Sequence, residues 1–164
     1  MGYYIHFLQT DKAQTTLSML ENALKQIDPA YSIAIWPEGW SGDLMYGSVR
    51  YGEIEINTPN QDLFGKEIAE LKDELQGLKA SSGDLWKHWP SKWNRVQTVL
   101  NETKMLVVVR VLIGGHGTEA ALLKIDPLWN WLLHHRHGLV YYDVDGYYDR
   151  SGLILSTSDD REEA

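Results

Sequence analysis

The sequence predicts a single α+β domain with a mostly antiparallel sheet covered by amphipathic helices. The chain has 164 residues, 43% hydrophobic and 23% charged, which suits one folded domain with one core. The predicted elements follow the order β-α-β-β-β-α-α-β-α-β-β-β, and strands that come in runs are typical of α+β proteins. We expect residues 1–156 to form the domain and residues 157–164 to form a disordered acidic tail.

The first part of the chain predicts a strand, a helix and a meander. Thr10 or Asp11 is the expected N-cap of a helix that ends before Pro29. Gly52 is the expected turn between the last two strands of the meander. The expected strands, each a short apolar or alternating run, are residues 3–8, 31–36, 44–51 and 53–57.

A strict alternation marks the last of these strands. Ile54 and Ile56 alternate with Glu53 and Glu55, so one face of the strand is buried and the other presents carboxylates. We expect Glu53 and Glu55 to face water or a partner.

Two helices and a buried strand are expected next. Residues 64–78 repeat apolar side chains at helical spacing, and Ser91 is the expected cap of a short helix that carries Trp93. Residues 105–113 are apolar except for Arg110, which predicts the central strand. The first of these helices carries acids that we expect on its outer face, namely Glu67, Glu70, Asp73 and Glu74.

The last third predicts more helix and three short strands. Thr118 is the expected cap of one helix, and Asp126 is the expected cap of another that starts at Pro127. One kinked helix through Pro127 is the alternative. After Gly138, the sequence predicts strands on either side of turns at 145–146 and 150–152.

A glycine-rich loop is the first candidate site. Gly114, Gly115, His116, Gly117 and Thr118 lie between the buried strand and a helix, where backbone amides can bind an anion. In that case His116 is a candidate catalytic or anion-contacting group. The phosphate-loop and dinucleotide patterns are both incomplete here, so an ordinary strand-to-helix turn is the favoured interpretation.

Metal and cofactor sites are not expected. The chain has no cysteine, which excludes thiolate chemistry. His134, His135 and His137 lie at a predicted helix end, where the helix dipole accounts for them without a metal. The acids around Gly146 do not follow the spacing of a calcium loop.

Aromatic and charged residues supply the remaining candidates. The chain has seven tryptophans and nine tyrosines but two phenylalanines. Tryptophan and tyrosine are favoured anchors of interfaces. Trp40, Trp86 and Trp89 lie in polar segments and are the candidates for a binding surface, together with Glu53 and Glu55. The net charge of −8 disfavours nucleic acid and fits a basic protein partner.

Two hypotheses of different classes follow. The favoured one is a non-catalytic protein-binding module, regulatory or toxin-neutralising, that meets a basic partner through acidic faces and exposed tryptophans. The alternative is a small enzyme or anion-binding protein that uses the loop 114–118 with His116. A homodimer is also possible. We expect a cytoplasmic protein without a membrane segment or leader.

Overall fold

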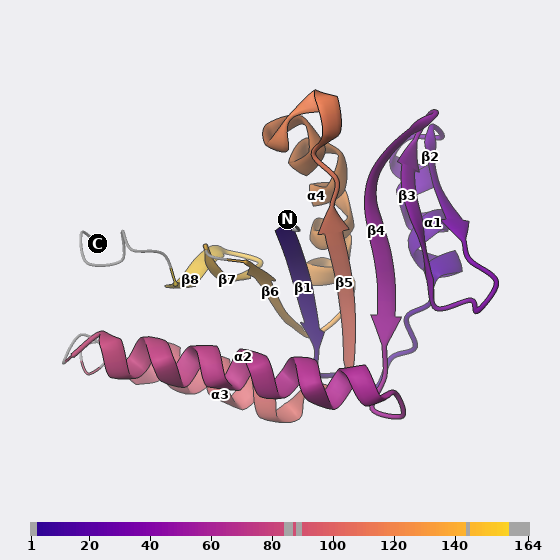
Figure 1. The fold of residues 1–164 in the computed structure, drawn as a ribbon. Coiled ribbons are helices and arrows are strands. Elements are labelled where there is room, and N and C mark those ends of the chain that lie inside the picture. Colours follow the sequence, from indigo (N-terminus) through magenta and orange to yellow (C-terminus); the bar gives the residue numbers. More distant parts are fainter. Residues whose placement is uncertain (1–2, 84–86, 88–89, 144, 158–164) are drawn as a thin grey trace.

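The computed structural model describes residues 3–83, 87, 90–143 and 145–157. Within these residues, four α-helices and one eight-stranded antiparallel sheet form the predicted α+β fold (Figure 1). The helices are α1 (Leu17–Ile27), α2 (Asp62–Ser81), α3 (Pro90–Glu102) and α4 (Thr118–His135). The strands are β1 (Tyr3–Gln9), β2 (Tyr31–Ile35), β3 (Ser41–Tyr46), β4 (Val49–Asn57), β5 (Met105–Val111), β6 (Gly138–Tyr142), β7 (Gly146–Asp149) and β8 (Gly152–Ser156).

The sheet is built around the pair of β1 and β5. Its strand order is β2-β3-β4-β5-β1-β6-β7-β8, so the predicted central strand lies inside the sheet. Alternate residues of β5 are buried on opposite faces: Val107 and Val109 on one, Leu106 and Val108 on the other. A strand buried on both faces reads as a continuous apolar run, which is why β5 could be predicted.

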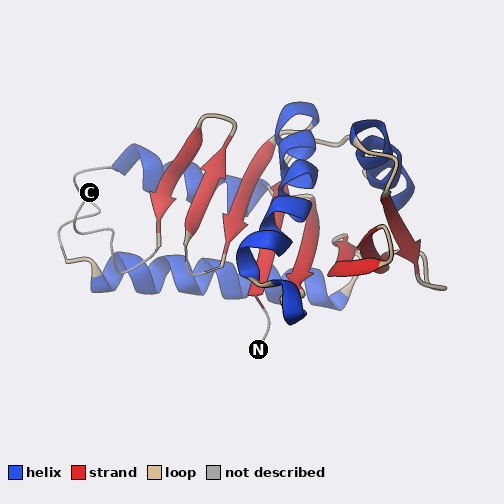
Figure 2. Ribbon diagram, turned by 90° about the horizontal axis from the view of Figure 1, so that it is seen from above, coloured by secondary structure: helices blue, strands red, loops and turns tan. Residues whose placement is uncertain are grey.

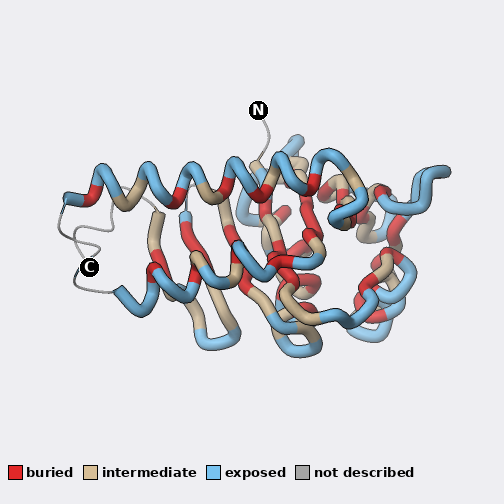
Figure 3. The backbone as a smooth tube through the Cα atoms, turned by 90° about the horizontal axis from the view of Figure 1, so that it is seen from below, coloured by how far each residue is buried: buried red, intermediate tan, exposed pale blue. Residues whose placement is uncertain are grey.

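Helices cover both faces of the sheet, but not along its whole width. α1 and α4 pack on the face of the sheet that carries Ile5 and Phe7, where they cover strands β1 to β6. α2 and α3 lie side by side on the other face, beneath β5, β1 and β6 to β8 (Figure 2). Each helix is buried only along one side, as the alternating colours of α2 show (Figure 3). Two apolar clusters result, one on each face.

Each end of the sheet therefore has one uncovered side. β2, β3 and β4 contribute no buried residue to the cluster beneath α2 and α3. β7 and β8 contribute none to the cluster beneath α1 and α4. Side chains on these uncovered sides are accessible for binding. In the described part of the chain, no helix has both the length and the apolar character needed to cross a membrane.

The start of the first helix was predicted wrongly. Residues 10–16 form a loop, and Thr16 is the N-cap of α1. The two expected caps bind the backbone of His137 instead: the Thr10 hydroxyl donates to its carbonyl, and the Asp11 carboxylate accepts from its N–H at 2.6 Å. A long-range contact thus replaces the local cap.

The position of the meander turn was also predicted wrongly. Gly52 lies inside β4, and the hairpin turn contains Gly47, whose φ of +61° favours glycine. A Cβ at position 52 would lie 2.8 Å from Cγ1 of Val109 and 3.2 Å from the carbonyl oxygen of Arg110. Gly52 is therefore there for close packing against β5, not for a turn.

α4 runs through Pro127 as one helix, so the prediction of a second helix capped by Asp126 is wrong. The Asp126 carboxylate accepts a hydrogen bond from Tyr142 at 2.8 Å and caps nothing. Proline removes the bond to the carbonyl four residues earlier. That residue, Leu123, is 69% exposed, and water on this side can satisfy its carbonyl group.

Two further expected caps lie inside their helices. α3 begins at Pro90, in a first-turn position that proline favours, so Ser91 is not its cap. Thr118 is the first residue of α4, and Gly117 precedes it without a side-chain capping bond. α3 exists as predicted with a different start, and the two helices predicted from Thr118 and from Pro127 are the single helix α4.

The packing at Gly52 generates a prediction. We expect Gly52→Ala to lower the free energy of unfolding by about 1–3 kcal/mol, because the added methyl group overpacks against β5. The matched control is Gly77→Ala in α2, where an added Cβ meets nothing within 4 Å. That control is expected to stabilise the protein by about 0.5–1 kcal/mol. Urea unfolding of both variants tests this, and equal stability of the two would contradict it.

Candidate functional site

Rows of side chains cross the uncovered side of β3 and β4 and continue onto β5 and β1. In one row Asp43 pairs with Glu53, Glu53 with Arg110, and Arg110 with Tyr4. The neighbouring row contains Glu55, Val108, His6 and Tyr141. The alternation of glutamates in β4 thus places Glu53 and Glu55 on this side, as the sequence predicts.

The second row ends in a cleft between α2 and the sheet, with a volume of about 280 Å3. We call it the acidic cleft. Its walls come from β1, β5, β6 and α2, and four of its residues are acids. The lining residues are Tyr4, His6, Glu67, Glu70, Leu71, Glu74, Val108, Tyr141 and Asp143. In the described part of the chain, no lysine or arginine lines it.

His6 forms part of the floor of the acidic cleft. It lies between Val108 and Tyr141 in the sheet, and 14% of its side chain is exposed. Nδ1 is buried and has no hydrogen-bond partner among the described residues. Burial lowers the pKa of His6 to about 4, because desolvation disfavours the imidazolium.

Glu67 forms the wall opposite His6. Its Oε2 lies 3.7 Å from Nε2 of His6, and 19% of its side chain is exposed. Burial, followed by the charges of Glu55 and Glu70, raises the pKa of Glu67 to about 7, although a hydrogen bond from Asn57 opposes this. Glu74, which accepts a hydrogen bond from Tyr141 at 3.2 Å, also has a raised pKa because of burial.

His6 and Glu67 are best treated as one titrating unit because their polar atoms are adjacent. Between about pH 4 and about pH 7 the unit holds one proton and has no net charge. Above pH 7 it loses that proton and becomes negative. The cleft therefore gains negative charge within the physiological pH range.

Asn57 connects the acidic cleft to the predicted surface residues. Its Nδ2 donates to Glu67 at 2.7 Å and to Glu55 at 3.3 Å. Asn57 also lines a pocket of about 330 Å3 with Trp40, whose side chain is 39% exposed. Asn57 thus bonds to Glu55 and to Glu67 of the cleft and shares a second pocket with Trp40.

Glu53 has a different electrostatic setting from Glu55. Its carboxylate lies 2.5 Å from Arg110 and 3.8 Å from Arg50, and Arg50 also contacts Asp43 at 3.2 Å. These pairs neutralise much of the charge on the strands. Glu55 instead accepts a hydrogen bond from Asn57 beside the acidic cleft.

The glycine-rich loop is a single 3-10 turn, Gly114–His116, before α4. Nε2 of His116 is hydrogen-bonded to the carbonyl oxygen of Leu112 at 2.7 Å, and its ring lies 4.6 Å from that of Tyr51. These contacts give His116 a structural role. Residues 114–118 line neither the acidic cleft nor the pockets of about 450, 340 and 330 Å3. An anion site at 114–118 stays a prediction.

The histidines at the end of α4 bond to their own helix. Nδ1 of His134 meets the carbonyl oxygen of Asn130 at 2.7 Å, and Nδ1 of His135 meets that of Trp131 at 2.9 Å. Across the described residues, no group of three or more His, Asp or Glu side chains is arranged to hold a metal ion.

The tryptophans divide into buried and exposed sets. Trp93 and Trp129 are buried, as their helical positions predict. Trp36, which was not among the candidates, is partly exposed and donates from Nε1 to Asp43 at 3.2 Å. Trp86 and Trp89 lie outside the described residues, as does the predicted tail beyond residue 157.

The acids of α2 were expected on its outer face, and for Glu67 this is wrong. Glu67, Glu70 and Glu74 share one side of the helix, and all three line the cleft. A signal was present in the sequence: each precedes an apolar residue of α2, namely Ile68, Leu71 or Leu75. They therefore flank the buried stripe rather than oppose it.

Comparisons with protein-family models, curated proteins and solved structures find no match for this chain.

The raised pKa of Glu67 generates a prediction about stability. Unfolded glutamate titrates near its ordinary pKa of 4.5 and folded Glu67 at about 7, so between these values the native state binds more protons. Stability from this group is present at low pH and is lost as pH rises through 7. We expect Glu67→Gln to gain about 2 kcal/mol over wild type at about pH 8, and much less at about pH 5.

Urea unfolding at both pH values measures this difference. The matched control is Glu102→Gln, at an exposed acid near the end of α3. A gain that is equal at both pH values, or equal in the control, would disprove the assignment to the cleft.

Proposed function

We propose that this chain is a non-catalytic protein-binding module, of the regulatory or toxin-neutralising type, that binds a basic segment of a partner protein. The acidic cleft is the observation that carries this proposal. Glu67, Glu70, Glu74 and Asp143 line it, with Glu55 beside it. The carboxylates of Glu67 and Glu74, whose pKa values are raised, are stabilised by a cation that reduces the repulsion among the acids of the cleft.

Buried polar atoms at the same place support the proposal. Nδ1 of His6 and Oε2 of Glu67 have no hydrogen-bond partner among the described residues. Buried polar groups are nearly always satisfied in native proteins. An ammonium or guanidinium group in the cleft would supply a donor to Glu67 and a counter-charge to its neighbours.

The surroundings of the cleft fit a protein partner rather than a lone cation. Trp36 and Trp40 are partly exposed in the connection between β2 and β3, and Asn57, which donates to Glu67, lines a pocket with Trp40. Exposed tryptophan beside a charged cleft offers apolar area together with electrostatic specificity. The uncovered side of β2 to β4 provides the surface on which a partner can extend.

Binding of a lysine-rich peptide tests the proposal directly. We expect an octapeptide of alternating lysine and glycine to bind saturably, and about tenfold more weakly in about 500 mM salt than in about 50 mM salt. The triple variant E67Q/E70Q/E74Q is expected to lose about tenfold in affinity. Calorimetric titration measures both effects.

The control is D73N/E102Q/E119Q, which changes the net charge equally at exposed residues outside the cleft. It should retain most of the affinity. If the peptide does not bind, or if both triple variants lose affinity equally, the cleft is not the binding site.

The titration of His6 and Glu67 predicts the pH dependence of this binding. Because the unit becomes negative above about pH 7, the peptide should bind more tightly at about pH 8 than at about pH 6, by about threefold or more. Glu55, Glu70, Glu74 and Asp143 face the same unit and add to its field. In Glu67→Gln the increase should disappear, and an unchanged pH dependence in that variant would contradict the assignment.

A further inference from the structure

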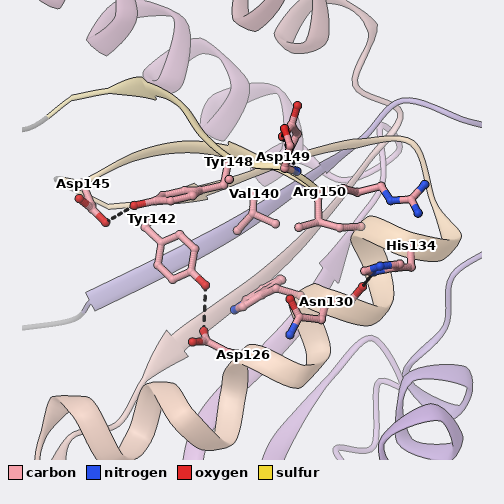
Figure 4. Close-up of a pocket in the computed structure, with 13 residues that line it drawn as sticks. Asp126, Asn130, His134, Val140, Tyr142, Asp145, Tyr148, Asp149 and Arg150 are labelled. Carbon is pink, nitrogen blue, oxygen red and sulfur yellow. Dashed lines mark hydrogen bonds between the residues drawn. The ribbon is translucent and has the colours of Figure 1, made fainter. Parts of the chain in front are cut away.

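A second pocket lies on the opposite face of the sheet, where α4 stops covering the strands (Figure 4). We call it the α4 pocket. Its volume of about 450 Å3 falls within the range of small-molecule sites, about 300–1,000 Å3. Asp126, Asn130 and His134 reach it from α4, Tyr142 from β6 and Tyr148 from β7. It shares no residue with the acidic cleft.

One end of the α4 pocket is formed by two tyrosine-carboxylate pairs. The Tyr142 hydroxyl donates to Asp126 at 2.8 Å, and the Tyr148 hydroxyl donates to Asp145 at 2.7 Å. The two tyrosine rings meet edge to face, with centroids 5.1 Å apart. The hydrogen bonds hold both carboxylates in place, and each carboxylate can accept further donors. This end suits an amino group beside a flat ring.

Trp129 supplies a buried donor in the wall of the pocket. Its side chain is 1% exposed, and its Nε1 has no hydrogen-bond acceptor among the described residues. Indole nitrogen can only donate, and buried donors seldom stay unsatisfied. A ligand that brings an acceptor would complete this wall.

The other end of the α4 pocket carries a guanidinium group, that of Arg150. Arg150 and His134 lie together there, away from Asp145 (Figure 4). The His134 ring is held by the bond between its Nδ1 and Asn130. The Arg150 guanidinium forms no hydrogen bond or ion pair with any described residue, whereas Asp149 is already bound to Arg95 at 2.7 Å.

The end at Arg150 continues into an adjacent pocket of about 340 Å3. The two pockets share His134, Asp149 and Arg150, and the second reaches Arg136 and His137. A second guanidinium, that of Arg136, therefore lies beyond the tyrosine-lined space. An anionic group placed there would meet Arg150 first.

From this distribution of charge we propose that the α4 pocket binds a small amphoteric ligand with a flat ring. The amino group lies at one of the two carboxylates, Asp126 or Asp145, the ring lies against Tyr142 and Tyr148, and the acidic group lies at Arg150. An aromatic amino acid is the simplest molecule of this class. The site is independent of the acidic cleft and of the function proposed for it.

Titration with three matched probes tests the proposal. L-Phenylalanine carries both charged groups, phenethylamine lacks the carboxylate, and 3-phenylpropionate lacks the amine. The indole N–H resonance of Trp129, assigned with Trp129→Phe, reports on occupancy by NMR. We expect L-phenylalanine to shift it saturably and each analogue to bind about tenfold more weakly.

Two variants locate the charges. Arg150→Gln should weaken L-phenylalanine and 3-phenylpropionate about fivefold and leave phenethylamine unchanged. Because Arg150 is exposed, this change does not threaten folding. Glu67→Gln, in the acidic cleft, should leave all three titrations unchanged.

Three results would overturn the proposal. One is the absence of a saturable shift of the Trp129 resonance with any probe up to about 20 mM, a limit that excludes even millimolar affinity. Another is an equal effect of Arg150→Gln on all three probes. The third is a loss of binding in Glu67→Gln, which would place the ligand in the acidic cleft. Binding of the lysine-rich peptide, measured separately, is affected by none of these results.

Discussion

The antiparallel pair of β1 and β5 is the constraint on which the rest of the structure depends. Ile5 and Phe7 of β1, with Val107 and Val109 of β5, are buried on one face, and Leu8 and Leu106 on the other. A strand pair that is apolar on both sides must be covered on both sides, since exposed apolar area costs free energy in proportion to that area. Two helices on each face provide this cover.

Four helices cannot cover an eight-stranded sheet completely, and their offset decides where polar chemistry occurs. α1 and α4 leave β7 and β8 uncovered on one face, and α2 and α3 leave β2 to β4 uncovered on the other. The acidic cleft lies where the edge of α2 meets the sheet, and the α4 pocket lies where α4 ends its cover. Both candidate sites thus follow from one feature of the packing, and they face opposite sides of the molecule.

His6 shows how the same packing alters chemistry. It follows the alternation of β1 onto the face that carries Leu8, and α2 buries it there. The same helix brings Glu67 within 3.7 Å of it. Burial then disfavours charge on both groups, lowering the pKa of the histidine and raising that of the acid. A short-range effect of desolvation makes the cleft sensitive to pH near neutrality.

The sequence alone determined the elements that local periodicity marks or that are apolar on both faces. The apolar run of β5 predicts a strand buried on both faces, the alternation at Glu53 and Glu55 predicts a strand buried on one face, and the apolar stripe of α2 predicts a helix buried along one side. The structure agrees. Tertiary contacts decided the rest. Thr10 and Asp11 bind His137 instead of capping a helix, Gly52 packs on Val109 instead of turning the chain, and Glu67 faces His6 instead of water. Each outcome depends on a residue distant in the sequence, and local periodicity carries no information about that residue.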